Sequence, residues 1–292
     1  MAQKRSKKHH YVSRAMQRPF CHSREKIWYS TRNEAGIFGD PEDRNIESTF
    51  KAKDYYTVND GDNLSDIVER DYFGPLDDLW GDFRQQVLDV LSRGKIPNFS
   101  KESADILKNT VISFARRSPD FMNYDDYETG MEIINNTILA LEESDDKFDE
   151  IPALQKQILL QSEVIKVGRD VRVRAQIDHS EKVEEAMQDF KIRWAKTDGK
   201  HSFILSSRMV YRIGNGGHNG ISNPNAEIWM PIAPSYCLIL LRDPQKEVQE
   251  INEIDVTFLR KINNYIVRES NQVGSHSEKL LRSLTNRRSA VR

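Results

Sequence analysis

The sequence predicts an α+β fold, in which a helical body over residues 62–195 is joined to a small, mainly antiparallel sheet built from residues 8–30 and 202–241. Within the body, apolar residues recur at intervals of three and four, which is the spacing of one helix face. After residue 197 the pattern changes to short β-type runs separated by Gly, Asn and Pro, as is typical of strands and turns. We therefore expect a single domain over residues 1–275.

Caps and prolines set the expected helix boundaries. Ser100 is a cap for the helix that follows it, and Pro119 ends that helix. Pro152 fits the first turn of a long helix, because a proline there gives up no intrahelical hydrogen bond. The stretches expected to be helical are 76–91, 101–118, 127–141, 152–175, 181–194 and a closing helix at 255–268.

Three C-terminal runs are expected to be strands, at 202–210, 227–231 and 236–241. The N-terminal strand should pair with the C-terminal ones, because neither region alone has enough strands for a stable sheet. Residues 276–292 form a basic tail that we expect to be mobile.

Composition favours a cytoplasmic protein. No apolar run approaches the ~20 residues that a membrane helix needs, and the charged start does not have the apolar core of a signal peptide. Cys21 and Cys237 are far apart, which favours a reducing compartment over a disulfide scaffold or a zinc ribbon.

Positive charge is concentrated at the two ends of a chain whose net charge is only -2. Basic segments of this kind can contact the phosphates of nucleic acid or an anionic protein partner. The alternatives are that the termini are simply solvated, and that basic residues at the end of a helix stabilise its negative end. The side chains expected to contact nucleic acid are Lys4, Arg5, Lys7, Lys8, Arg14, Arg116 and Arg117.

Established cofactor motifs are missing from the sequence. The glycine-rich stretch 214–220 has neither a Walker ending nor a dinucleotide-loop context, so it is an ordinary connection between strands. The histidines do not have metal-site spacing, and no serine lies in a Gly-x-Ser-x-Gly elbow. We expect no metal and no cofactor.

A possible catalytic group comes from His10 and Tyr11, which place a neutral-pH proton carrier beside a phenol. In a metal-free site that cleaves RNA, such a histidine could take the proton of a 2′-hydroxyl while an arginine steadied the phosphate. Ser206 and Arg208 interrupt an apolar strand of the same sheet, and we expect them to complete the group.

Buried polar groups need partners, because an unpaired one costs about 1–3 kcal/mol. We therefore expect His9 or, more specifically, His10 to lie within direct or water-bridged reach of Ser206, Ser207 or Arg208. The alternative is that His10 packs or hydrogen bonds beside an edge strand and has no chemical role.

The segment Lys8-His9-His10-Tyr11-Val12-Ser13-Arg14, followed by Phe20 and Lys26-Ile27-Trp28-Tyr29, resembles the opening of a bacterial family, domain-of-unknown-function family 4238. Blocks similar to those of the family follow in order at residues 53–56, 67–69, 114–119, 203–210, 229–234 and 262–264. Ser13 stands where the family has Pro, and Ser207 and Met209 stand where it has Asp and Pro. If that Asp were a catalytic acid or a metal ligand, this chain would lack it.

Two hypotheses of function follow. The first is a nucleic-acid-directed protein of a bacterial defence or mobile-element system, which binds or cleaves RNA or DNA. The second is a non-catalytic binding or assembly subunit that has lost an ancestral site.

Overall fold

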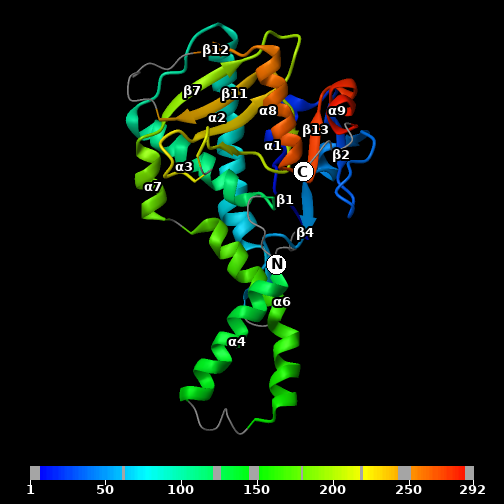
Figure 1. Ribbon diagram of the computed structural model, residues 1–292, viewed down its shortest axis with the longest axis vertical. Helices are drawn as coiled ribbons and strands as arrows, with labels where there is room; N and C mark the ends of the chain where they lie inside the picture. The colour runs from blue at the N-terminus through cyan, green and yellow to red at the C-terminus, as the bar shows by residue number, and fades with distance from the viewer. Residues whose placement is uncertain are drawn as a thin grey trace, which may run out of the picture. The chain divides into compact units, whose positions relative to one another are not determined.

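The computed structural model describes residues 7–60, 63–120, 126–144, 151–178, 180–217, 220–242 and 251–286. Its helices and antiparallel sheets confirm the α+β class (Figure 1). The chain divides into two compact units, of which the first comprises residues 1–9, 52–75 and 122–178, and the second residues 10–51, 76–121 and 179–292. A single domain over residues 1–275 stays a prediction.

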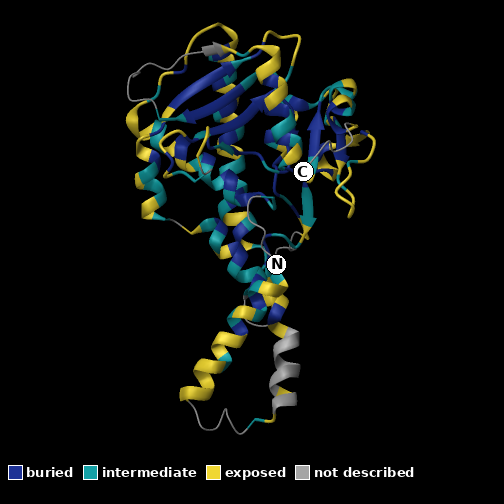
Figure 2. Cartoon of the chain, in the orientation of Figure 1, coloured by how far each residue is buried: buried dark blue, intermediate teal, exposed yellow. Residues whose placement is uncertain are grey.

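The first unit is built on two antiparallel helices, α4 (Asp126–Ser144) and α6 (Ala153–Ile177). They touch backbone to backbone at Gly130 and Gly168: a Cβ atom on Gly130 would lie 1.9 Å from the carbonyl oxygen of Val164. A Cβ atom on Gly168 would lie 1.7 Å from the carbonyl oxygen of Asp126. Beyond the crossing, the outer half of α4 is exposed (Figure 2).

A polar network ties α6 to its neighbours in the first unit. The Arg172 guanidinium donates to both carboxylate oxygens of Asp126, at 2.7 and 3.2 Å, and to the carbonyl of Tyr55. Burial disfavours the charged guanidinium, but its hydrogen bonds with Asp126 raise the pKa of Arg172 above its ordinary value. The unit also contains the hairpin strands β5 (Val58–Asp60) and β6 (Asn63–Ser65) and the π-helical turn η3 (Glu69–Phe73).

The second unit contains a five-stranded sheet in the order β12-β7-β11-β10-β9. All neighbouring pairs are antiparallel except β12 and β7. The expected helix 181–194 is wrong in its second half: α7 ends at Gln188, and Lys191–Lys196 is a strand because Ile192 and Trp194 alternate into the core against β11. The strands are β7 (Lys191–Lys196), β9 (Tyr211–Ile213), β10 (Glu227–Ala233), β11 (Tyr236–Leu241) and β12 (Ile251–Glu253).

Helices pack against both faces of this sheet. On the face that carries Trp194, the ring of Phe99, in the connection between α2 and α3, lies 6.4 Å from the Trp194 ring. On the opposite face, the Phe258 ring of α8 lies 5.7 Å from that of Trp229. The helices are α2 (Gly74–Ser92), α3 (Lys101–Arg117), which Ser100 caps as expected, α7 (Glu181–Gln188) and α8 (Val256–Arg268).

A separate four-stranded antiparallel sheet joins the N- and C-terminal parts of the second unit, in the order β3-β2-β13-β8. The N-terminal strand β2 thus shares a sheet with β8 of the expected C-terminal strands, but it pairs directly with β3 and with β13, which was not expected to be a strand. The strands within residues 211–241 belong to the other sheet. The expected strand 202–210 is reduced to the two residues of β8. The strands are β2 (Lys26–Thr31), β3 (Glu42–Asn45), β8 (Leu205–Ser206) and β13 (Gln272–Ser275).

Part of the expected C-terminal tail is helical. Residues Glu278–Thr285 form α9, in which Leu281 and Leu284 are buried, whereas residues 287–292 lie outside the described residues. The remaining short elements are β1 (Lys8–His10), α1 (Arg14–Gln17), η1 (Arg18–Phe20), η2 (Ile46–Ser48) and β4 (Lys51–Lys53). Of the helices in the described part of the chain, none has the length and apolarity required to cross a membrane.

Candidate functional site

The side chain of His10 is held by the backbone. Its Nε2 lies 3.2 Å from the carbonyl oxygen of Ile46, so Nε2 carries the proton that it donates there. Burial is the largest cause that lowers the pKa of His10, from 6.5 to about 4; the hydrogen bond to Ile46 opposes this, and the charges of Lys51, Arg14 and Arg117 lower the pKa further. His10 is therefore neutral at neutral pH and a weak base.

The hydrogen bond described for His10 thus goes to Ile46 rather than to Ser206, Ser207 or Arg208. His9 has a different environment in the first unit. Its ring is fully buried, and its Nδ1 accepts a hydrogen bond of 2.9 Å from the backbone N–H of Tyr56. The His9 ring also stacks on the Tyr56 ring, which gives His9 a packing role.

Two of the sequence blocks do meet, through Tyr11 and Ser207, at the first residue of β13. The hydroxyls of Tyr11 and Tyr29 both donate to the side-chain oxygen of Gln272. On the backbone side of the same residue, the N–H of Gln272 donates to Ser207 Oγ over 3.1 Å. We call the group formed by Tyr11, Tyr29, Asp120, Ser207, Asn271 and Gln272 the Gln272 cluster.

Asp120 is the member that the sequence did not indicate. Its carboxylate accepts hydrogen bonds from Ser207 Oγ, from the side-chain amide of Asn271 at 2.7 Å and from the backbone N–H of Asn271 at 3.2 Å. Asp120 follows the end of α3 and lies 87 residues before Ser207 in the chain, so periodicity could not associate the two. Its only sequence signal is an acid directly after the helix-ending Ser118-Pro119. A carboxylate thus contacts Ser207, the position where the resembling family carries Asp.

Ser206 and Arg208 lie in other environments. Ser206 Oγ hydrogen bonds to the hydroxyl of Tyr211 and donates to the carbonyl of Arg208. The Arg208 guanidinium forms an ion pair of 3.3 Å with Glu269. Of the residues predicted to be catalytic, Ser206 and Arg208 thus contact each other, whereas the hydrogen bonds described for His10 and Tyr11 go to Ile46 and Gln272.

The surroundings of the Gln272 cluster keep the Tyr29 hydroxyl protonated, so that it acts as a hydrogen-bond donor. Burial is the main cause that raises the pKa of Tyr29, and the negative charge of Asp120 adds to it, so the hydroxyl stays protonated at neutral pH. Burial lowers the pKa of Arg32, and the negative charges of Asp120 and Glu269 oppose this shift. The Arg32 guanidinium already donates to the carbonyls of Gly36, Val267 and Ser270. The cluster consists of donors and acceptors that satisfy one another, which suits it to fixing β13 in place.

The side chains predicted to contact nucleic acid differ in how far they are exposed to solvent. Arg117 cannot contact a phosphate, because its side chain is fully buried, pairs with Asp77 at 2.5 Å and donates to the carbonyl of His10. Arg116 is half-buried at the end of α3, whereas Lys7, Lys8 and Arg14 are exposed. Lys4 and Arg5 lie outside the described residues.

The fold and these contacts define an α+β protein with a helical hairpin, a five-stranded sheet and a four-stranded sheet fixed by a polar cluster. The chain belongs to the family described as protein of unknown function (DUF4238), whose model matches residues 8–278. Comparisons with curated proteins and with solved structures gave no match.

Proposed function

We propose that the protein binds the phosphate backbone of nucleic acid through a basic patch formed by Arg14 and Lys51 next to His10. The observation that carries the proposal is that the charged groups with the largest influence on the pKa of His10 are all cations, namely Lys51, Arg14 and Arg117. Arg117 is buried and paired with Asp77, so we assign phosphate binding to the other two cations, Arg14 and Lys51. Such charge attracts phosphates without regard to sequence.

The positions of the two side chains support this proposal. Arg14 is exposed at the start of α1, and Lys51 is half-buried with its Nζ 2.5 Å from the carbonyl oxygen of Glu47. Lys7 and Lys8 lie three and two residues before His10 in the chain and are exposed as well. Flexible cationic side chains of this kind position a protein on a nucleic-acid backbone.

Binding without cleavage fits the chemistry better than a nuclease does. A general base works best when its pKa lies near the operating pH, whereas that of His10 is lowered to about 4. Its Nε2–H is also engaged by the Ile46 carbonyl. When the protein binds nucleic acid, His10 is a neutral residue beside the basic patch.

The test is the salt dependence of binding to a labelled oligonucleotide duplex, measured by fluorescence anisotropy. Arg14→Gln with Lys51→Gln should reduce the log–log salt slope by about 0.9 for each duplex phosphate contact that is lost. The matched control is Arg260→Gln with Lys261→Gln, which removes the same two charges from exposed positions on α8. No binding at low salt, or equal losses in both double variants, would contradict the proposal.

A cytoplasmic location belongs to the same proposal. Cys21 and Cys237 are both free thiols, which supports a reducing compartment. Burial, with a smaller effect of Glu25, raises the pKa of Cys21 to about 11, so this thiol resists oxidation by remaining protonated.

A further inference from the structure

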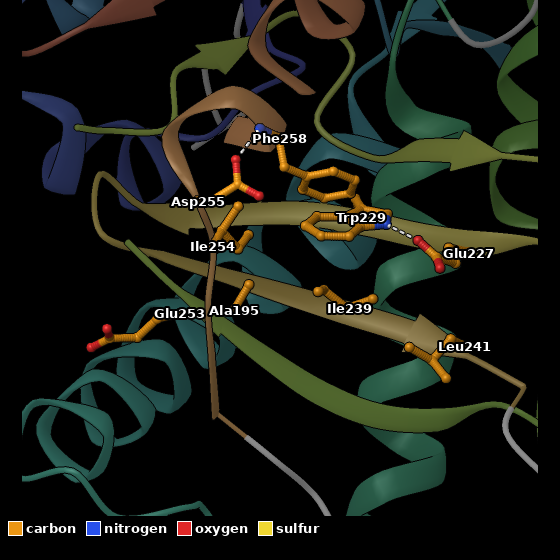
Figure 3. A pocket seen from close by; sticks show the side chains of 9 residues that line it. All are labelled: Ala195, Glu227, Trp229, Ile239, Leu241, Glu253, Ile254, Asp255 and Phe258. Carbon is orange, nitrogen blue, oxygen red and sulfur yellow. Dashed lines mark hydrogen bonds between the residues drawn. The ribbon is translucent and has the colours of Figure 1, made fainter. Parts of the chain in front are cut away.

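A cavity of about 290 Å³ lies in the second unit, between the five-stranded sheet and the start of α8 (Figure 3). Its floor is apolar and comes from three strands, with Ala195 of β7, Ile239 of β11 and Trp229 of β10. These residues share one face of the sheet, opposite the face that carries Trp194. The cavity is large enough for a small organic group and is separate from the basic patch around His10.

Two aromatic rings form part of the cavity wall. The ring centroids of Trp229 and Phe258 are 5.7 Å apart and the rings are tilted by 52°, so they present two non-parallel surfaces (Figure 3). The indole Nε1–H donates to a carboxylate oxygen of Glu227 over 2.7 Å, which fixes the orientation of the Trp229 ring. The faces of such rings carry partial negative charge and attract cations.

All the charged residues that line the cavity are acids: Glu227, Glu253 and Asp255. Asp255 uses one carboxylate oxygen to cap α8 by accepting from the N–H of Phe258, and Glu227 uses one to hold Trp229. Each keeps a second oxygen. The side chain of Glu253 is 72% exposed, and its carboxylate is 3.9 Å from Lys196, so Glu227 and Asp255 contribute most of the field in the cavity.

The arrangement favours a diffuse positive charge over a metal ion. A metal ion needs several ligands that converge on one point, and the described residues contain no group of three His, Cys, Asp or Glu that could hold one. Aromatic surfaces combined with nearby carboxylates suit an ammonium group that carries alkyl substituents instead.

We propose that this cavity binds a small quaternary ammonium group, with its alkyl carbons against Trp229 and Phe258 and its charge balanced by Glu227 and Asp255. The inference does not depend on the proposed nucleic-acid binding, because none of these residues belongs to the basic patch.

The experiment is a calorimetric titration of the full chain with choline at constant ionic strength. The comparison ligand is the neutral isostere dimethylbutanol, in which a carbon atom replaces the nitrogen. Choline should bind saturably and the isostere more weakly. Glu227→Gln keeps an acceptor for Trp229 but removes the charge, and it should weaken choline binding about fivefold or more while leaving isostere binding unchanged.

Phe258→Ala tests the aromatic contribution, since Phe258 is 39% exposed and the backbone N–H at this position can still donate to the Asp255 carboxylate that caps α8. It should weaken choline binding by roughly two- to fivefold, the usual size of an exposed cation–π contact. Val256→Ala is the control, because Val256 lies in the same helix turn, is 37% exposed and does not line the cavity. Absent choline binding, equal binding of the isostere, or unchanged choline affinity in Glu227→Gln would each overturn the proposal.

Discussion

His10 shows how one residue can combine a local structural role with an electrostatic one. Its ring is partly buried and bonded to the Ile46 carbonyl, in surroundings where the neighbouring charges are positive. Burial and the positive neighbours favour the neutral imidazole, whereas the hydrogen bond to Ile46 favours the protonated one. The protonation state of His10 therefore depends on the pH and on any anion that binds next to Arg14 and Lys51.

The pKa of His10 predicts a pH dependence of stability. The pKa is about 4 in the folded protein and 6.5 in the unfolded chain, so between these values the unfolded chain binds more protons. Stability should accordingly fall as the pH drops from 6.5 towards 4. His10→Gln, which does not titrate, should show a smaller fall than the wild type in urea unfolding measured across this range.

Other groups titrate in the same pH range, and the comparison with the wild type accounts for them. One of these groups is His276, because burial lowers its pKa as well. Their contributions are common to both proteins and cancel in the difference. Stability curves that run parallel from pH 6.5 to 4 would show that His10 is not responsible.

At the scale of elements, the crossing of α4 and α6 depends on two glycines. A methyl group at Gly130 would overlap the backbone of Val164, so Gly130→Ala should force the helices apart and lower the melting temperature. Gly81→Ala in α2 is the matched control, because its Cβ would meet only Ala15 at 3.4 Å. Glycine destabilises a helix interior by roughly 0.5–1 kcal/mol relative to alanine, so Gly81→Ala should be neutral or stabilising. An unchanged melting temperature for Gly130→Ala would contradict the close crossing.

Elements with a long periodic pattern were predictable from the sequence. The helices now seen as α2, α3, α4 and α6 follow from three- and four-residue spacing together with Ser100 and Pro152. In contrast, β13 has the sequence Gln-Val-Gly-Ser, which has no strand signal of its own. A Cβ atom at Gly274 would lie 2.7 Å from Ile27 Cδ1 and 3.3 Å from the Phe50 ring, so a larger residue there would make these buried side chains shift, a constraint that only the tertiary pairing reveals.

The same reason limits what could be predicted of the site. The sequence predicted that His9 or His10 would lie near Ser206, Ser207 or Arg208. In the structure it is the neighbouring Tyr11 that joins Ser207, since both contact Gln272. It could not indicate Gln272 or Asp120, since polar residues of loops and short strands carry no periodicity that records their partners. Long-range contacts in the Gln272 cluster are decided by sheet pairing instead.

At the scale of the whole molecule, N-terminal and C-terminal segments pair within the second unit. β2 pairs with β13 from Trp28 to Thr31, and the loop 33–37 beyond it is largely exposed. Limited proteolysis in this loop should leave the N-terminal fragment bound, because the β-ladder and the Tyr11–Gln272 contact remain. Size-exclusion chromatography should show the fragments together under native conditions and apart in denaturant. Release of the N-terminal fragment from a folded remainder would contradict this.

The position of β13 between β2 and β8 has a consequence for how the chain is made. Of the four strands in that sheet, β13 is the last to leave the ribosome, although it occupies a central position. Until it emerges, β2 and β8 have no common neighbour, and their facing edges are open to pairing with other chains. The four-stranded sheet can therefore be completed only after residues 272–275 have left the ribosome, and until then the open edges of β2 and β8 are sites at which aggregation could begin.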